Sequence, residues 1–161
     1  PRGNGVGVNL PSNDEKIIIG KGRVVKEGKK IALLNFGARL KECLIADENL
    51  KKKGINLSII DARFSKPLDE NLIWQIAIDH EAIITIEEGS IGGFGSHVGQ
   101  FLTDKNLLDN NLKYRSMILP DRFIDHDKPE LMYKYAGLDA KSIETKVLDT
   151  LNSKVVIKKT N

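Results

Sequence analysis

Short apolar runs alternate with helical patterns from residue 31 to residue 119, and this alternation constrains the fold more than any other feature. The first run, Ile31-Ala32-Leu33-Leu34, is apolar throughout, which predicts a strand buried on both faces. Further strands are expected over residues 56–60, 82–86 and 116–119, with helices between them. This order predicts an α/β fold with three layers, in which a mostly parallel open sheet carries helices on both faces.

Capping signals mark the ends of the expected helices. The first helix is expected from about Ala38, with Gly54 as its left-handed cap. Asp69 marks the start of the second helix, and Ser96 is expected to cap the third. The last third of the chain is expected to be helical, with Asp139 as the N-cap of the final helix.

The segments outside this alternation predict the limits of the domain. Residues 1–15 spread glycine and proline among polar residues and are expected to form a connector. Residues 16–19 and 23–26 flank a Gly-Lys-Gly turn signal and are expected to form a hairpin. One domain is therefore predicted over residues 16–152, followed by a lysine-rich tail over residues 153–161 that is expected to be loosely ordered.

Composition excludes several classes of protein. The net charge of +3 comes from basic and acidic residues that are interspersed, so no single-signed face for nucleic acid is expected. No apolar run approaches the roughly 18 residues that a membrane span needs. Cys43 is the only cysteine, which excludes an internal disulfide and a multi-cysteine metal site and suits a reducing compartment. Its helical spacing to Leu40 and Leu44 predicts a buried, inert thiol.

The glycine-rich segment GSIGGFGSHVG, residues 89–99, is the first candidate site. A glycine-rich turn from a strand into a helix exposes backbone N–H groups that suit phosphate. The glycine spacing differs from the known nucleotide motifs, so a tight turn is favoured over an anion site. Ligands usually sit where strands of such sheets end, and there the chain carries charges such as Asp61, Arg63, Glu87 and Glu88. A small-molecule or regulatory anion site is one interpretation of these charges. We expect instead that they cap helices and pair across loops or a subunit interface, because no pair of nucleophile and base emerges.

Neighbouring carboxylates and scattered histidines give no catalytic pair. Glu87 and Glu88 are adjacent in a predicted strand, so they face opposite sides and do not share a proton. The three histidines, His80, His97 and His126, lie in separate segments without metal-ligand spacing. His80 is expected to have a structural role near the end of a helix.

Arg2 is the one residue singled out for binding. It lies between Pro1 and Gly3, where little side-chain bulk surrounds it, and its planar guanidinium suits a phosphate or a carboxylate.

A series of motifs spans nearly the whole chain: PRGNGVGV, IGKGR, LLNFG, DARFSKPLD, TIEEGSIGGFGSHV, LPDRFIDH and AGLDA. Their order closely resembles the end of the 1-deoxy-D-xylulose-5-phosphate synthase family, from Pro1 to about Leu151. DARFSKPLD and EEGSIGGFGSHV are the most specific pieces, and the wider transketolase family shares looser versions of the second.

The resemblance implies a fold like the transketolase C-terminal domain, with residues 1–15 as the end of a preceding domain. It implies a thiamine diphosphate transferase that condenses pyruvate with glyceraldehyde 3-phosphate, releases CO2 and forms 1-deoxy-D-xylulose 5-phosphate, a precursor of isoprenoids, thiamine and pyridoxal. Thiamine diphosphate and Mg²⁺ are then bound by upstream domains, and no catalytic, cofactor-binding or metal-binding residue is expected in this segment. Arg2 matches the family's arginine that holds the substrate phosphate.

The resemblance also implies partners and a location. The upstream domains of the same protein and a second subunit of a homodimer are expected to contact this module, which should be inactive alone. A bacterial cytoplasm is expected in preference to a plastid. Two alternatives stay open: the C-terminal domain of another transketolase or of a 2-oxo acid dehydrogenase β-type thiamine enzyme, or a free-standing regulatory module that binds anions.

Overall fold

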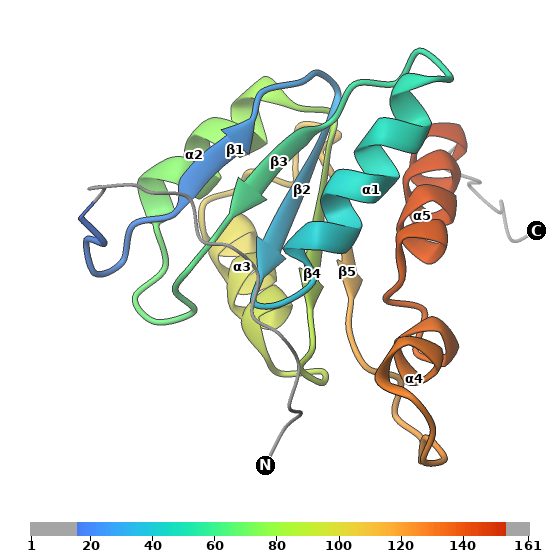
Figure 1. The fold of residues 1–161 in the computed structure, drawn as a ribbon. Coiled ribbons are helices and arrows are strands. Elements are labelled where there is room, and N and C mark those ends of the chain that lie inside the picture. Colours follow the sequence, from blue (N-terminus) through green and yellow to red (C-terminus); the bar gives the residue numbers. More distant parts are fainter. Residues whose placement is uncertain (1–15, 154–161) are drawn as a thin grey trace, which may run out of the picture.

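A computed structural model of the chain describes residues 16–153, and Figure 1 shows its ribbon. The predicted connector, Arg2 included, and residues 154–161 of the predicted tail lie outside the described residues. The elements occur in the order β1 (Arg23–Lys26), β2 (Ile31–Phe36), α1 (Leu40–Lys51), β3 (Ser58–Asp61), α2 (Glu70–Asp79), β4 (Ala82–Glu87), α3 (Phe94–Asp104), β5 (Lys113–Met117), α4 (Pro129–Tyr135) and α5 (Ala140–Asn152).

The five strands within residues 16–153 form one sheet in the order β1-β3-β2-β4-β5. Strands β3, β2, β4 and β5 pair in parallel, whereas β1 pairs antiparallel with β3. The central strands β2 and β4 are buried along almost their whole length, as their continuous apolar sequences require. The predicted mostly parallel sheet is confirmed.

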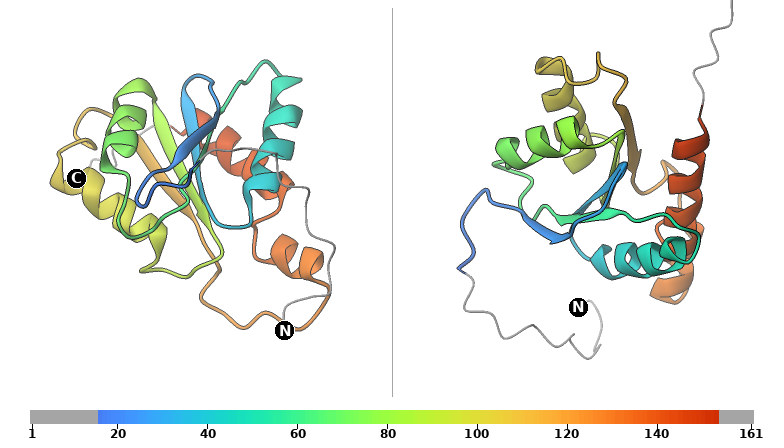
Figure 2. Two further views of the ribbon diagram at one scale, coloured as in Figure 1. Left: turned by 60° about the vertical axis from the view of Figure 1, so that its left-hand side comes forward. Right: turned by 90° about the horizontal axis from the view of Figure 1, so that it is seen from above.

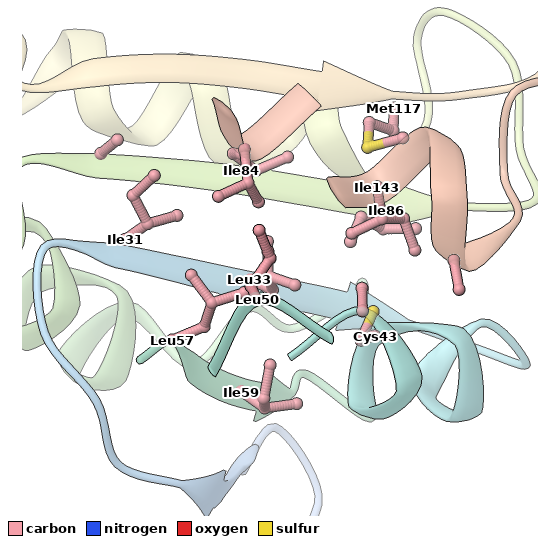
Figure 3. Close-up of a cluster of buried hydrophobic side chains, with 14 of the residues drawn as sticks. Ile31, Leu33, Cys43, Leu50, Leu57, Ile59, Ile84, Ile86, Met117 and Ile143 are labelled. Atoms are coloured by element: carbon pink, nitrogen blue, oxygen red, sulfur yellow. The ribbon is translucent and has the colours of Figure 1, made fainter. Parts of the chain in front are cut away.

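Helices cover both faces of this sheet, which gives the three predicted layers (Figure 2). On one face, Ile31, Leu33 and Ile84 pack with residues of α1 and α5 such as Leu50 and Ile143 (Figure 3). On the other face, the alternate residues of the same strands pack against α2 and α3, with Leu34, Ile83, Ile73, Phe94 and Val98 among them. The two-residue period of a strand therefore divides one apolar run between two cores.

Most of the predicted helix caps are confirmed. Gly54, with φ of +77°, follows α1 in the left-handed conformation. Asp69 accepts a hydrogen bond from the Leu72 N–H at the start of α2, and Asp139 accepts one from the Ser142 N–H at the start of α5.

None of the described helices is both long enough and apolar enough to cross a membrane.

The predicted hairpin is wrong. Residues 16–19 form no strand, and the Lys21 N–H donates to the Ile18 carbonyl in a tight turn instead. Strand β1 pairs with the edge of β3, where Arg23 lies opposite Asp61 and pairs with its carboxylate at 3.2 Å. The turn itself forms, but the strand after it pairs with β3 and not with residues 16–19.

The fourth predicted strand begins earlier than expected. Strand β5 runs over Lys113–Met117, whereas the sequence predicts a strand over residues 116–119. The Lys113 N–H donates to the Glu81 carbonyl at 3.0 Å, and its ammonium group donates to the Thr150 carbonyl at 2.9 Å. These two bonds fix Lys113 at the start of β5. The polar, asparagine-rich sequence before residue 116 does not indicate a strand there.

Candidate functional site

The parallel strands end at one edge of the sheet, the lower edge in Figure 1, and the glycine-rich segment follows β4 there. Ligand sites of open α/β sheets commonly form at this edge. Three of the four parallel strands carry a polar or flexible feature at this end, namely Gly37 after β2, Asp61 in β3 and Glu87 in β4. These features form the candidate site.

Glu87 fills the position where an anion would bind. It is the last residue of β4 and only 3% exposed. Its carboxylate accepts hydrogen bonds from the N–H groups of Phe94 at 3.0 Å and Gly95 at 2.8 Å, at the N-terminus of α3. A helix N-terminus favours negative charge because its first N–H groups have no partner within the helix. The domain therefore supplies its own anion to this helix.

The predicted Ser96 cap is wrong for the same reason. Helix α3 begins at Phe94, two residues before Ser96, and has Gly93 as its N-cap. The Ser96 hydroxyl instead accepts a hydrogen bond from the Gly92 N–H at 2.9 Å, within the turn. The sequence does contain a signal for the true arrangement, since two carboxylates, Glu87 and Glu88, precede the glycine-rich segment.

The glycines allow the backbone to approach Glu87 closely. A Cβ atom on Gly89 or Gly93 would lie 2.4 Å from the Glu87 Oε2 atom. A Cβ atom on Gly95 would lie 2.7 Å from the Thr85 hydroxyl. Real side chains do not tolerate such distances, so these positions exclude every residue with a Cβ unless the site moves. The interpretation of this segment as a tight turn is confirmed.

Tyr114 of β5 supports the turn from the neighbouring strand. Its hydroxyl donates to the Gly95 carbonyl at 2.5 Å and lies 3.0 Å from the Thr85 hydroxyl. Burial raises the pKa of Tyr114 to about 12; the Thr85 hydrogen bond opposes this rise, and the Glu87 charge adds to it. Tyr114 therefore stays a neutral donor that fixes the first turn of α3.

Glu88 faces the opposite side of the sheet, as the alternation of strand residues predicts. Its carboxylate lies 2.7 Å from the Arg39 guanidinium, and both side chains are largely buried. The same guanidinium lies over the Tyr133 ring, 3.6 Å from its centroid. Arg39 thus connects the start of α1 and the end of β4 to α4. The sequence analysis does not predict this contact.

The remaining edge charges also find partners inside the domain. Asp61 pairs with Arg23 at 3.2 Å and with Arg63 at 4.0 Å. The Arg122 guanidinium lies over the Tyr135 ring, 4.5 Å from its centroid. The expectation that these charges pair across loops is confirmed for Asp61 and Glu88, while Glu87 caps a helix.

Cys43 and His80 have the structural roles predicted for them. Cys43 is fully buried, and burial raises the pKa of its thiol to about 12, with a further rise from Glu42. The His80 ring contacts the Ser58 hydroxyl at 2.7 Å and the Ile76 carbonyl at 2.9 Å. Over residues 16–153, no three metal-ligating side chains of the His, Cys, Asp or Glu type come together.

Comparisons with known proteins identify the same kind of domain. The family model described as "Transketolase, C-terminal domain" matches residues 20–143. A solved structure described as a split gene transketolase, inactive β4 tetramer, has 28% sequence identity and a TM-score of 0.77, with 86% of this chain and 44% of that chain covered.

Two more distant structures share the fold. A transketolase from Campylobacter jejuni has 15% identity and a TM-score of 0.60, with 81% of this chain and 18% of that chain covered. A transketolase from Pichia stipitis has 13% identity and a TM-score of 0.57, with 82% and 18% covered. The chain thus spans less than half the length of each of the three structures.

Proposed function

The chain belongs to the transketolase C-terminal domain family, and we propose that it is the closing domain of a 1-deoxy-D-xylulose-5-phosphate synthase. The whole enzyme condenses pyruvate with glyceraldehyde 3-phosphate, releases CO2 and forms 1-deoxy-D-xylulose 5-phosphate. In this proposal the domain is a scaffold for folding and for homodimer assembly. Its upstream partner domains carry the reaction in a bacterial cytoplasm.

The observation that carries this proposal is the Glu87 carboxylate on the N-terminus of α3. The glycine-rich turn is where a phosphate group would be expected, yet the domain's own anion already accepts its hydrogen bonds. The described residues therefore do not fit the diphosphate of thiamine diphosphate at this edge. We assign the cofactor and its Mg²⁺ to the upstream domains, where enzymes of the transketolase family generally bind them.

Arg2 supplies the one substrate contact in this proposal. The residue lies outside the described residues, so its role rests on the PRG motif and on its chemistry. A guanidinium binds phosphate through two parallel hydrogen bonds, which orient the substrate as well as attract it. We propose that residues 1–15 end the preceding domain, that residues 16–152 form this one and that residues 153–161 are a tail.

Two motifs favour the synthase over its relatives. DARFSKPLD occupies residues 61–69 and LPDRFIDH occupies residues 119–126. A second candidate is another transketolase-type enzyme, because the structure with 28% identity is a transketolase. The free-standing anion-binding module is disfavoured, since Glu87 competes with any external anion for the N–H groups of α3.

The proposal is tested with the full-length parent enzyme and with a version that ends before Lys16. Pyruvate labelled at its carboxyl carbon and glyceraldehyde 3-phosphate are supplied together with thiamine diphosphate and Mg²⁺. We expect the full-length enzyme to release labelled CO2 and to form 1-deoxy-D-xylulose 5-phosphate, and we expect the shortened enzyme to lose most activity. Two-carbon transfer from a ketose phosphate without CO2 release would identify another transketolase instead.

A further inference from the structure

Asn35 in β2 is a buried amide whose side-chain oxygen has no hydrogen-bond partner. The residue is 0% exposed, and no group within residues 16–153 donates to its Oδ1 atom. Two other buried atoms also lack an aligned hydrogen bond, Arg39 Nε and Glu88 Oε1, but they lie 2.7 Å from each other in an ion pair. Among the described residues, Asn35 thus keeps a buried side-chain acceptor without a partner of opposite charge or polarity.

The surroundings of Asn35 favour an apolar side chain at this position. Residues two apart in a strand face the same side, so Asn35 follows Ile31 and Leu33 on the face that packs against α1 and α5. Its partner in the neighbouring strand β4 is Ile86, which is fully buried in the same cluster. An unpaired polar atom in such surroundings destabilises the folded state. Stability alone therefore does not explain an asparagine here.

The other half of the Asn35 amide fixes an exposed turn. Its Nδ2 atom donates to the Gly37 carbonyl at 2.8 Å. Gly37 is exposed and has φ of +94°, so water can solvate its carbonyl if the amide is absent. The bond therefore adds little stability, but it sets the orientation of the turn. Arg39 follows two residues later and pairs with Glu88, so the turn also determines where this guanidinium lies.

The Gly37 turn lies at the switch point of the sheet, where the strand order reverses. From β2 the chain continues through α1 to β3 on one side, and from β4 it continues through α3 to β5 on the other side (Figure 1). Open α/β sheets usually form their contacts with ligands at this point. A Cβ atom on Gly37 would meet nothing within 4 Å, so the outer side of the turn is open.

We propose that Asn35 is a positioning residue for the reaction of the parent enzyme, which holds the Gly37 turn in the shape that the upstream cofactor-binding domains contact. The buried amide oxygen lowers the stability of this domain, and the orientation of the turn is what the amide provides in return. Unfavourable local features of this kind persist where function requires them. This inference rests on the function proposed above, because it requires upstream domains that carry out the reaction.

The first experiment measures the stability of the 161-residue chain by urea unfolding at one protein concentration. Asn35→Val removes the unpaired oxygen and the bond to Gly37, and it places a β-branched side chain in a buried strand. We expect its unfolding equilibrium constant to be about 10-fold lower than that of the wild-type chain. Gly37→Ala keeps the amide but disfavours the positive φ of the turn, so its unfolding constant should be about 5–30-fold higher.

The second experiment measures kcat of the full-length enzyme by CO2 release. We expect Asn35→Val and Gly37→Ala each to lower kcat by about 10-fold or more, and the double variant to be no slower than the slower single variant, because both act on one turn. A purely structural role would not lower kcat in a variant that is more stable. Thr150→Val is the control, since it removes a buried hydroxyl of α5 that donates to the Lys146 carbonyl, and it should leave kcat unchanged.

Three results would overturn the role of Asn35: an Asn35→Val enzyme with unchanged kcat, an Asn35→Val chain that is less stable than the wild-type chain, or effects of the two turn variants on kcat that simply multiply. The wild-type enzyme tests the synthase assignment separately. If it releases CO2 and Asn35→Val keeps its kcat, only the role of Asn35 is refuted. If it releases no CO2, the synthase assignment is refuted, and the same variants are compared in two-carbon transfer from a ketose phosphate.

Discussion

Neutralising Glu87 tests whether its carboxylate stabilises the N-terminus of α3. Glu87→Gln keeps the size of the side chain, but its amide can accept only one of the two α3 N–H bonds well and carries no charge. The variant leaves one buried donor poorly paired and removes a carboxylate from a helix N-terminus. Hydrogen bonds to charged groups contribute about 1.5–3 kcal/mol, so we expect a loss of about 3 kcal/mol of unfolding free energy.

Urea unfolding followed by circular dichroism measures this loss. For a chain of this length, about 3 kcal/mol corresponds to a fall in Tm of roughly 6–12 °C. Glu81→Gln is the matched control, because the Glu81 side chain is 64% exposed and lies 3.9 Å from an exposed lysine, so its loss should stay within about 0.5 kcal/mol. Equal unfolding free energies of Glu87→Gln and the wild-type chain would refute the stabilisation of α3 by the Glu87 carboxylate.

Three further predictions concern Tyr114, Cys43 and Arg2. Because the folded state raises the Tyr114 pKa from 10.0 to about 12, the stability that depends on its protonated hydroxyl is complete below pH 10 and is lost as the pH rises toward 12. The difference in unfolding free energy between the wild-type chain and Tyr114→Phe should shrink over that range, and a constant difference would contradict the assigned pKa. The Cys43 thiol should resist a thiol-reactive dye in the folded chain and react once urea unfolds it, whereas rapid labelling of the native chain would contradict its burial. In the full-length enzyme, Arg2→Ala should lower kcat/KM for glyceraldehyde 3-phosphate by about 10–100-fold and Arg2→Lys by less, with pyruvate binding little changed. Unchanged kinetics would remove the proposed phosphate contact.

The sequence predicts the layered architecture well because that architecture depends on patterns within each element. Ile31-Ala32-Leu33-Leu34 can be buried on both faces only inside a sheet with helices on each side. Asp69 and Asp139 each accept a hydrogen bond from an N–H group three residues further along the chain, so the local sequence is sufficient to predict both helix caps.

The errors arise where a partner distant in the sequence decides the local structure. Strand β1 pairs with β3, where Arg23 lies opposite Asp61, 38 residues further along the chain, and the turn signal after residue 19 cannot reveal this. The cap of α3 comes from Glu87 in the preceding strand, because the glycines let the helix backbone approach that carboxylate. The Arg39–Tyr133 stack joins segments that only the folded chain brings together.

In the function proposed above, this domain supports a reaction whose cofactor binds elsewhere in the parent enzyme. Isothermal titration of the purified 161-residue chain with thiamine diphosphate and Mg²⁺ measures where the cofactor binds, with the full-length enzyme titrated in parallel. We predict saturable binding to the full-length enzyme and no heat of binding to the isolated chain. Tight binding of thiamine diphosphate to the isolated chain, followed by turnover of pyruvate, would contradict the account.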